Sequence, residues 1–253
     1  MRVLLHGCNG KMGQVMTRTL AGLPDMKVVC GVDTEPDKVR NCYPVYASLK
    51  AVEESPDIVI DFSHRTCLDA LLEFGQARHV PLVICTTGFN DEERQRMADV
   101  SRNVPILNSG NMSLGVNLIL SLVRQAAAVL QDGFDVEIVE KHHNQKVDAP
   151  SGTALMIADA VRSALDHSME YVYERHSKTG KRQRNEIGIH SVRGGAIVGE
   201  HSVTFAGQGE VVEISHSALS RDVFAHGAIK AAGFLLAKGP GLYSMRDVIE
   251  AQA

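Results

Sequence analysis

The sequence predicts an α/β protein of two domains, and three observations lead to this prediction. In residues 1–113, short apolar strands alternate with helical stretches, and the near-continuous Val, Ile and Leu of these strands suits a parallel sheet covered on both faces. Beyond residue 130, the strands alternate apolar and polar residues, as expected where one sheet face is more polar. A length of 253 residues suits two modest domains.

The strands of the first domain are expected at residues 2–7, 27–33 and 57–63, and within residues 80–89 and 104–113, where each strand runs into a turn. Helices should connect them. After the first strand, Met12, Val15, Met16 and Leu20 recur at helical spacing, and residues 67–79 form the next helix. Residues 91–101 begin with acidic residues, which the positive end of a helix favours.

The second domain should open with a long helix at residues 114–130. The stretches DVEIVEKHH, YVYERHS, IGIHSVRGG, GEHSVTFAG and EVVEISHSAL contain alternating segments typical of strands, and one helix interrupts them near Ser151. We therefore expect an α+β domain with an open mixed sheet over residues 114–221. The last 32 residues read as helical and should return to the first domain, which then comprises residues 1–113 and 222–253.

Composition excludes several functional classes. The chain has 44% hydrophobic and 22% charged residues, and its 30 acidic and 26 basic residues give a formal charge of −4. That balance does not suit a nucleic-acid-binding protein, and no apolar run approaches the roughly 20 residues that span a bilayer. The cysteines are odd in number and form no C-x-x-C pair, which predicts reduced thiols and a cytoplasmic protein; they are Cys8, Cys30, Cys42, Cys67 and Cys85.

A glycine turn follows the first strand. Gly7, Gly10 and Gly13 form G-x-x-G-x-x-G between a strand and a helix, where the backbone can approach a pyrophosphate bound at the helix N-terminus. Asp33 ends the second strand, 20 residues beyond Gly13, and is placed to accept hydrogen bonds from an adenine ribose. Together these features favour a Rossmann-like dinucleotide site, although Asn9 occupies a position that is glycine in the commoner motif.

The same residues predict the choice of cofactor. Asp33 should repel the 2′-phosphate of NADPH, and Thr34 supplies no compensating charge, whereas Lys11, Lys38 or Arg40 could still bind that phosphate. We expect NADH to be preferred and NADPH to be tolerated. The turns at residues 86–88 and 108–113 follow later strands and should lie beside the nicotinamide, although turn chemistry alone would explain their composition equally well.

The stretch KHHNQKVDAPSGTA at residues 141–154 admits three readings. Neighbouring His142 and His143 point to opposite faces of a strand and have no cysteine nearby, which disfavours a metal site. A solvated polar loop is the second reading. The third is an acid–base site, because histidine exchanges protons near neutrality and Lys146 can donate one while attracting an anion.

The end of this stretch resembles a receptor for a carboxylate. Ser151 is a good helix N-cap, Gly152 exposes backbone amides and Thr153 adds a hydroxyl. These residues indicate a reductase of a small carboxylated substrate, with the proton donor on the second domain and the hydride donor on the first.

The residues from Glu140 to Ala154, E-x-HH-x-x-K-x-DAPSGTA, resemble the signature of the 4-hydroxy-tetrahydrodipicolinate (dihydrodipicolinate) reductase family. GCNGKMG, VIDFS, TTGF, NMSLGVN, VGEH and ISHSALSR resemble other segments of that family, so the resemblance covers the whole chain. It implies a Rossmann-like domain completed by the C-terminal segment, a second sheet domain that assembles homotetramers, and NAD(P)H-dependent reduction of 4-hydroxy-tetrahydrodipicolinate in lysine and diaminopimelate biosynthesis.

The resemblance also implies a role for each matching residue. His142 would be the acid–base residue and Lys146 the proton donor, with His143, Gly152 and Thr153, beside Ser151, holding the dicarboxylate substrate. The residues that would line the cofactor are Gly7, Cys8, Asn9, Gly10, Lys11, Met12, Asp33, Cys85, Thr86, Thr87, Ser109, Gly110, Asn111 and Met112. Cys85 and Met112 stand where other members often have a glycine and an aromatic residue. Two alternatives stay open: an NAD-dependent reductase of another small dicarboxylic or amino acid, and a non-catalytic NAD-binding sensor.

Overall fold

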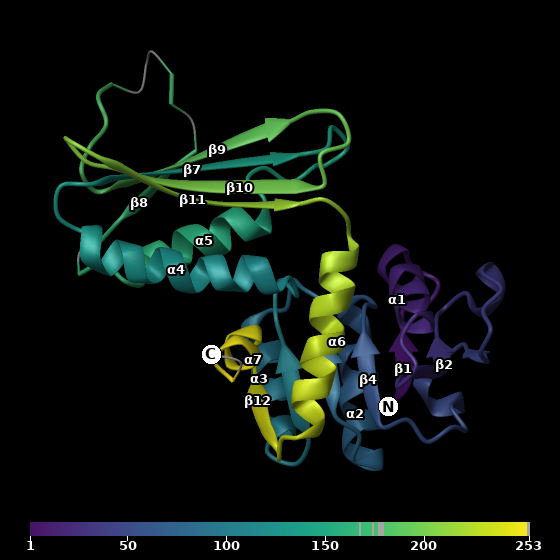
Figure 1. Cartoon of the computed structure of the whole chain (residues 1–253). Helices are drawn as coiled ribbons and strands as arrows, with labels where there is room; N and C mark the ends of the chain where they lie inside the picture. The colour runs from purple at the N-terminus through teal and green to yellow at the C-terminus, as the bar shows by residue number, and fades with distance from the viewer. Residues whose placement is uncertain (167, 174, 177–179, 252–253) are drawn as a thin grey trace. The chain divides into compact units, whose positions relative to one another are not determined.

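The computed structural model describes residues 1–166, 168–173, 175–176 and 180–251 (Figure 1). The chain divides into two compact units. The first comprises Met1–Leu114 and Arg221–Ala253, and the second comprises Gly115–Ser220.

The first unit contains a seven-stranded sheet whose order is β12-β6-β5-β4-β1-β2-β3, with every neighbouring pair parallel. Its strands are β1 (Arg2–His6), β2 (Lys27–Val32), β3 (Val45–Tyr46), β4 (Ile58–Asp61), β5 (Leu82–Ile84), β6 (Pro105–Asn108) and β12 (Gly241–Tyr243). Its helices are α1 (Lys11–Ala21), α2 (Leu68–Arg78), α3 (Asp91–Ser101), α6 (Asp222–Leu236) and α7 (Met245–Glu250), with short 3₁₀ turns η1 (Pro36–Lys38), η2 (Leu49–Ala51) and η3 (Arg65–Cys67).

Helices cover both faces of this sheet, which explains why its strands are apolar throughout. Val3 and Leu5 of β1 belong to a core formed with α1, α6 and α7, whereas Leu4 belongs to the opposite core formed with α2 and α3. Side chains that alternate along one strand therefore all become buried. The carboxyl ends of β1, β4, β5 and β6 meet at one edge of the sheet, where a parallel sheet binds its ligands.

Two short strands of this sheet, β3 and β12, differ from the sequence-based expectation. The last 32 residues were expected to be helical, but β12 separates α6 from α7 and pairs with β6 at the edge of the sheet. Gly239, Pro240 and Gly241 stop the helix, because proline and glycine are the poorest helix formers. Leu242 then pairs with Ile106.

The second unit is built on a mixed five-stranded sheet of order β11-β10-β7-β9-β8. Its middle strand β7 runs antiparallel to β10 and parallel to β9. The strands are β7 (Asp135–His142), β8 (Glu170–Val172), β9 (Glu186–Arg193), β10 (Gly199–Ala206) and β11 (Val211–Ala218), and the helices are α4 (Leu114–Leu130) and α5 (Gly152–Arg162). Figure 1 shows both helices along one face of this sheet.

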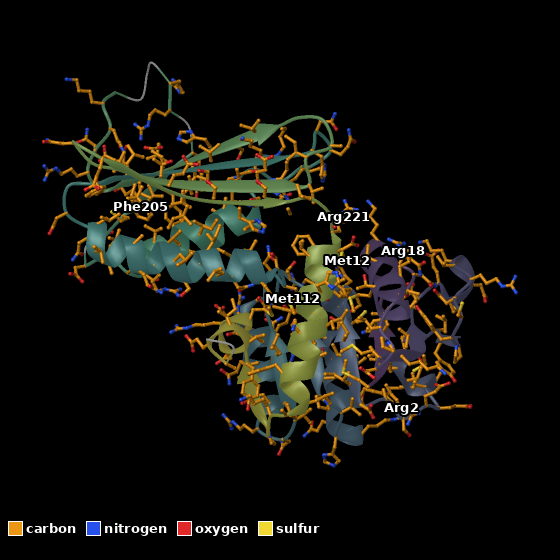
Figure 2. All side chains as sticks on the ribbon, viewed as in Figure 1. Arg2, Met12, Arg18, Met112, Phe205 and Arg221 are labelled. Atoms are coloured by element: carbon orange, nitrogen blue, oxygen red, sulfur yellow. The ribbon has the colours of Figure 1, made fainter. Side chains whose placement is uncertain are left out.

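The core of the second unit lies between that face and the two helices. Phe205, labelled in Figure 2, is 1% exposed and packs in a cluster with residues of α4, α5 and three strands. The inward-facing positions of β7 are apolar at Val136 and Ile138 but polar at Glu140 and His142. A polar group thus begins on the inner face where the helical cover ends. Within the described ranges, no helix is long and apolar enough to cross a membrane.

Candidate active site

The glycine turn after β1 is shaped by close backbone contacts. Gly7 has a φ of +75°, in the left-handed region, and a Cβ placed there would lie 2.6 Å from the carbonyl oxygen of Phe62. A Cβ on Gly13 would lie 2.2 Å from the oxygen of Gly7. Gly10 is the N-cap of α1, so the turn delivers the backbone amides at the start of that helix to the sheet edge. This geometry fits a pyrophosphate bound by main-chain N–H groups.

Asp33 is held beside the glycine turn. Its Oδ2 accepts a hydrogen bond from the backbone N of Asn9 at 3.0 Å, and its Oδ1 accepts one from Glu35 N at 3.1 Å. The Asn9 side chain donates to the oxygen of Glu35 at 2.6 Å. Cys8 points into the core, where burial raises its pKa to about 12, so only its main chain is available to a ligand.

A cavity of about 390 Å³ opens beside this turn within the first unit. Met12, Met112 and Arg221, labelled in Figure 2, come from three separate segments of this unit that meet at the cavity. The complete lining is Lys11, Met12, Phe62, Cys85, Gly110, Asn111, Met112, Arg221 and Phe224. Sulfur and aromatic side chains dominate its wall, and the cations of Lys11 and Arg221 are exposed.

The structure brings only part of the expected cofactor residues to this cavity. Lys11, Met12, Cys85, Gly110, Asn111 and Met112 line it, whereas Gly7 to Gly10 and Asp33 form the adjoining turn. Thr86, Thr87 and Ser109, the other three expected residues, are not among those that line the cavity. Thr87 is exposed, the Thr86 hydroxyl donates to Asp61 Oδ2 at 2.7 Å, and the Ser109 hydroxyl donates to Asn111 O at 2.8 Å.

Sequence reasoning missed Phe62, Arg221 and Phe224 in the cavity wall. Phe62 follows the carboxyl end of β4 directly, a position that could have signalled a ligand contact. Arg221 and Phe224 come from the start of α6, far away in the sequence, so no local pattern marks them. Burial raises the pKa of the Cys85 thiol well above its ordinary value, and the charge of Asp61 adds to this effect. Cys85 therefore lines the cavity as a neutral side chain.

A buried ion pair lies beneath this edge of the first unit. His6 Nδ1 is 2.9 Å from Asp61 Oδ1, and both side chains are at most 7% exposed. Burial alone would lower the pKa of His6, but its contacts with Asp61 and Cys67 outweigh that effect and raise it to about 9. Asp61 also accepts hydrogen bonds from Ser63 and Thr86. The pair ties together the ends of β1, β4 and β5.

The second unit places its polar cluster at the end of β7. His142 Nδ1 lies 2.5 Å from Glu140 Oε2, and the Glu140 side chain is completely buried. Because a carboxylate only accepts hydrogen bonds, the ring proton of His142 lies on Nδ1. Arg193, directly opposite His142 on β9, forms a bidentate pair with Glu140 at 2.6 and 2.8 Å.

The carboxylate of Glu140 also holds the start of α5. Its Oε1 accepts the backbone N–H of Ser151 at 3.1 Å. The Ser151 hydroxyl caps the helix by accepting from Ala154 N at 3.2 Å, and it lies 3.1 Å from His201 Nε2. Burial and the neighbouring His142 lower the pKa of His201 to about 4, so His201 is neutral at physiological pH. Ser151 thus acts as the cap rather than as an exposed hydroxyl.

Lys146 and Gly152 complete this end of the second unit. Lys146 Nζ donates to both carboxylate oxygens of Asp148, at 2.7 and 2.8 Å, and its side chain is 20% exposed. Gly152 is exposed, and a Cβ added there would meet nothing within 4 Å. His143 and Thr153 are half-buried beside them. The six residues expected at the catalytic and substrate positions therefore lie at the end of β7, in the turn after it and at the start of α5. No group of three or more His, Cys, Asp or Glu residues in the described part of the chain could hold a metal ion.

Comparisons with known proteins place this arrangement in a family. Residues 1–112 match the family model described as dihydrodipicolinate reductase, N-terminus, and residues 115–249 match the model described as dihydrodipicolinate reductase, C-terminus. The chain is 53% identical over 249 residues to a 4-hydroxy-tetrahydrodipicolinate reductase of Caldanaerobacter subterraneus subsp. tengcongensis, covering 98% of each chain. It is 46% identical over 244 residues to the enzyme of the same name from Clostridium tetani, covering 96% of this chain and 95% of that one.

Solved structures agree with this assignment. A dipicolinate-bound dihydrodipicolinate reductase from Paenisporosarcina sp. TG-14 superposes with a TM-score of 0.82 at 27% identity, covering 96% of this chain and 97% of that one. A diaminopimelate dehydrogenase from Corynebacterium glutamicum shares the fold alone, with a TM-score of 0.57 at 14% identity over 98% of this chain and 93% of that one. The two family models together span nearly the whole sequence, and the chain belongs to the dihydrodipicolinate reductase family.

Proposed function

We propose that this protein reduces 4-hydroxy-tetrahydrodipicolinate to tetrahydrodipicolinate with NAD(P)H, in lysine and diaminopimelate biosynthesis. The full-length relatives bear the name of this activity. The observation that carries the proposal is the cluster at the end of β7, where a histidine, a lysine and an open helix start lie on one surface of the second unit.

The first unit would hold the cofactor. The backbone amides between Gly7 and Lys11 would bind the pyrophosphate, and the cavity lined by Met12, Cys85 and Met112 would hold the nicotinamide half. When bound, the reduced nicotinamide supplies a hydride. Cys85 and Met112, which depart from the commoner residues of the family, would contact it through apolar surface. Phe62 and Phe224 would add aromatic surface to the same wall.

The second unit would hold the substrate by its carboxylates. Helix N-termini bind anions through their backbone N–H groups and the helix dipole, and Gly152 leaves the start of α5 open to such a group. Thr153 and His143 lie beside it and would add polar contacts. The relative from Paenisporosarcina was solved with dipicolinate bound, which supports a planar dicarboxylate as the kind of ligand that this site takes.

Lys146 would supply the proton that completes the reduction. Its ammonium is a compact donor near the helix start, and Asp148 orients it by accepting two hydrogen bonds. His142 carries its proton on Nδ1, facing Glu140, which leaves Nε2 as the acceptor of the neutral ring. His142 would therefore act as the acid–base residue that sets the hydrogen-bonding environment of the substrate ring.

We propose that NADH is preferred over NADPH. Asp33 is fixed beside the glycine turn by two backbone N–H groups, where its charge opposes a 2′-phosphate. Lys38 cannot compensate freely, because its Nζ pairs with Glu35 Oε2 at 2.5 Å. Lys11, at the first position of α1, and the exposed Arg40 are the other cations that would let the site tolerate NADPH.

We also propose a homotetramer built on the open sheet of the second unit, as the family resemblance implies. The face of this sheet away from α4 and α5 carries half-buried residues such as Val139, Lys141 and Thr204. This face, which the helices of the unit leave uncovered, is the surface that we propose for contacts between subunits. Light scattering coupled to size-exclusion chromatography tests the proposal, with about four times the 27.4 kDa chain mass expected.

A coupled assay tests the proposed reaction. The substrate is made in situ from pyruvate and aspartate semialdehyde by a dihydrodipicolinate synthase, and NADH oxidation is followed by its absorbance. Fast oxidation that needs both precursors is expected. NADH oxidation only with other small dicarboxylic or amino acid precursors would indicate a different reductase. NADH binding without oxidation of any of them would indicate a non-catalytic sensor.

A further inference from the structure

The ion pair of the buried Glu140 with Arg193 contacts His142, the start of α5 and the loop that carries Lys146. We propose that Glu140 and Arg193 are positioning residues that hold His142, the start of α5 and the Lys146 loop in fixed positions relative to one another. The expected loss of kcat rests on the proposed function, whereas the expected change in the His142 tautomer concerns the protein without ligands.

The two oxygens of Glu140 divide the task. Oε1 accepts from Ser151 N at 3.1 Å and from Arg193 Nη2 at 2.6 Å. Oε2 accepts from His142 Nδ1 at 2.5 Å and from Arg193 Nη1 at 2.8 Å. Four donors thus converge on a carboxylate that is 0% exposed. A buried carboxylate with this many charge-assisted hydrogen bonds has little freedom to move.

Glu140 therefore selects one form of His142. A carboxylate in contact with Nδ1 requires the proton on that nitrogen and leaves Nε2 without one in the neutral ring. The ring also lies close to Gly199, where an added Cβ would approach Nε2 to 3.1 Å. Gly199 on β10 thus leaves room for the His142 ring, because it has no side chain at that place. Tautomer and ring position are both set before substrate arrives.

Arg193 extends the link to the lysine loop. Besides the two bonds to Glu140, its Nη2 donates to the backbone oxygen of Asp148 at 2.8 Å. The Asp148 carboxylate in turn holds Lys146 Nζ. A single guanidinium therefore connects β9, the buried Glu140 and the loop that carries Lys146. Its planar fork suits this geometry, which the single ammonium of a lysine could not reproduce.

The charges around the pair explain why Glu140 stays ionised. Burial alone would raise its pKa, but its interactions with Arg193, Ser191 and His142 outweigh burial and lower it to about 2. Lys146, Asp148 and the neutral His201 are the other ionisable groups nearby, and His216 lies opposite His201 on β11. Glu140 is thus a fixed negative charge over the working pH range, and it holds its donors without exchanging a proton.

The variant Glu140→Gln tests the inference. The two donors at the Oε1 position, Ser151 N and Arg193 Nη2, cannot accept, so the amide oxygen of glutamine should take that position. Its NH₂ group then faces His142 Nδ1, which must become an acceptor, and Arg193 Nη1, which cannot accept and must move away. We expect the His142 tautomer to change from Nδ1–H to Nε2–H, observed by long-range ¹H–¹⁵N NMR. We expect kcat to fall by at least about 30-fold, because the catalytic groups are misplaced. The Kd for NADH, measured by calorimetry, should stay within twofold of the wild-type value.

The matched control is Glu200→Gln. Glu200 lies on β10 opposite Lys141, forms a half-exposed ion pair with it at 3.1 Å, and touches none of the groups above. It should keep the tautomer and change kcat less than twofold. If Glu140→Gln fails to fold, the double variant Glu140→Gln/Arg193→Met, which leaves no unpaired buried charge, should fold and show the same slow turnover.

Three outcomes would overturn the inference: an unchanged His142 tautomer in Glu140→Gln, a kcat within threefold of wild type in the variant that folds, or a loss in Glu200→Gln as large as in Glu140→Gln. The proposed function fails separately, if the wild-type protein does not reduce the in situ substrate. The NMR result needs no substrate, so the two failures are distinguishable. Arg193→Lys adds a further check. Its kcat should lie below that of the wild-type protein, because a single ammonium cannot replace the planar fork of the guanidinium.

Discussion

The two units each contain a buried histidine–carboxylate pair at the end of a strand, but the pairs are balanced differently. In the first unit, His6 lies 2.9 Å from Asp61, whose other hydrogen bonds come from neutral Ser63 and Thr86. In the second unit, Glu140 has the permanent cation Arg193 as well as a histidine. His6 is therefore the cation that pairs with Asp61, whereas Glu140 has Arg193 as a counter-ion in addition to its histidine.

This difference separates a structural histidine from one suited to chemistry. Contacts with Asp61 and Cys67 raise the pKa of His6 to about 9, and the His6 side chain is only 7% exposed. His142, 12% exposed at the end of its strand, has its tautomer set by Glu140, which accepts from Nδ1. Arg193 thus gives Glu140 a permanent cation in addition to the histidine, whereas the cation beside Asp61 is His6 itself.

Removal of the proposed proton donor should show the chemical role of the second unit. We expect Lys146→Ala to lower kcat by at least ~10², the typical contribution of a general acid, while the Kd for NADH stays within twofold. Lys141→Ala, five residues earlier and paired with Glu200, is the control and should change kcat less than threefold. Steady-state kinetics and calorimetry give both values. A loss of only a few fold in Lys146→Ala would remove Lys146 from the role.

A methyl group at Gly13 should damage the first unit alone. Its Cβ would lie 2.2 Å from the Gly7 oxygen, so we expect Gly13→Ala to lower the free energy of unfolding by about 3 kcal/mol, the upper end for overpacking. NADH affinity should fall at least tenfold, because the turn must move. Urea unfolding and calorimetry measure these effects. Gly22→Ala, whose Cβ would lie 3.6 Å from its nearest neighbour, should be near neutral, and equal effects at both glycines would contradict the account.

The His6 pair should make the first unit sensitive to alkaline pH. A folded pKa of about 9, above the unfolded value of 6.5, gives stability that is complete below pH 6.5 and lost as pH rises through 9. We expect the stability gap between wild type and His6→Asn to shrink by about 2 kcal/mol between pH 6 and 8.5. Urea unfolding at both values measures it. A constant gap would mean that His6 is neutral.

The Glu140 cluster should respond at the opposite end of the pH scale. Its folded pKa of about 2, below the ordinary 4.5, gives stability that is present above pH 4.5 and lost as pH falls through 2. The stability gap between wild type and Glu140→Gln should therefore narrow by about 2 kcal/mol between pH 6 and pH 3. The same unfolding measurements apply. A gap that widens in acid would refute the assignment of Glu140 as a fixed charge.

The smallest effect concerns cofactor choice. Glu35→Gln removes the carboxylate that pairs with Lys38 and leaves a cation close to the proposed ribose site. We expect kcat/KM for NADPH to rise about two- to fivefold, as one exposed charge contributes at most about 1 kcal/mol, with little change for NADH. Asp37→Asn, on the same loop, is the control. A wild-type preference for NADPH above a hundredfold would overturn the proposed NADH preference.

Much of this organisation was predictable because it depends on local sequence patterns. The glycine turn after the first strand requires small residues at fixed spacing, and the SGT segment is a helix start whose cap the structure shows. The partners that stabilise these features were not predictable. Glu140 and Arg193 are 53 residues apart, and only the pairing of β7 with β9 brings them together. His6 and Asp61 lie in apolar strands, where a polar residue gives no sign of its partner.

The most direct test of the proposed reduction follows the transferred hydrogen. The protein is incubated with NADH carrying two deuterium atoms at nicotinamide C4 and with the substrate made in situ, and the tetrahydrodipicolinate product is analysed by mass spectrometry. The account predicts a product that gains one deuterium for each NADH consumed, and no such product with Lys146→Ala on the same timescale. NADH oxidation that leaves the product free of deuterium would contradict it.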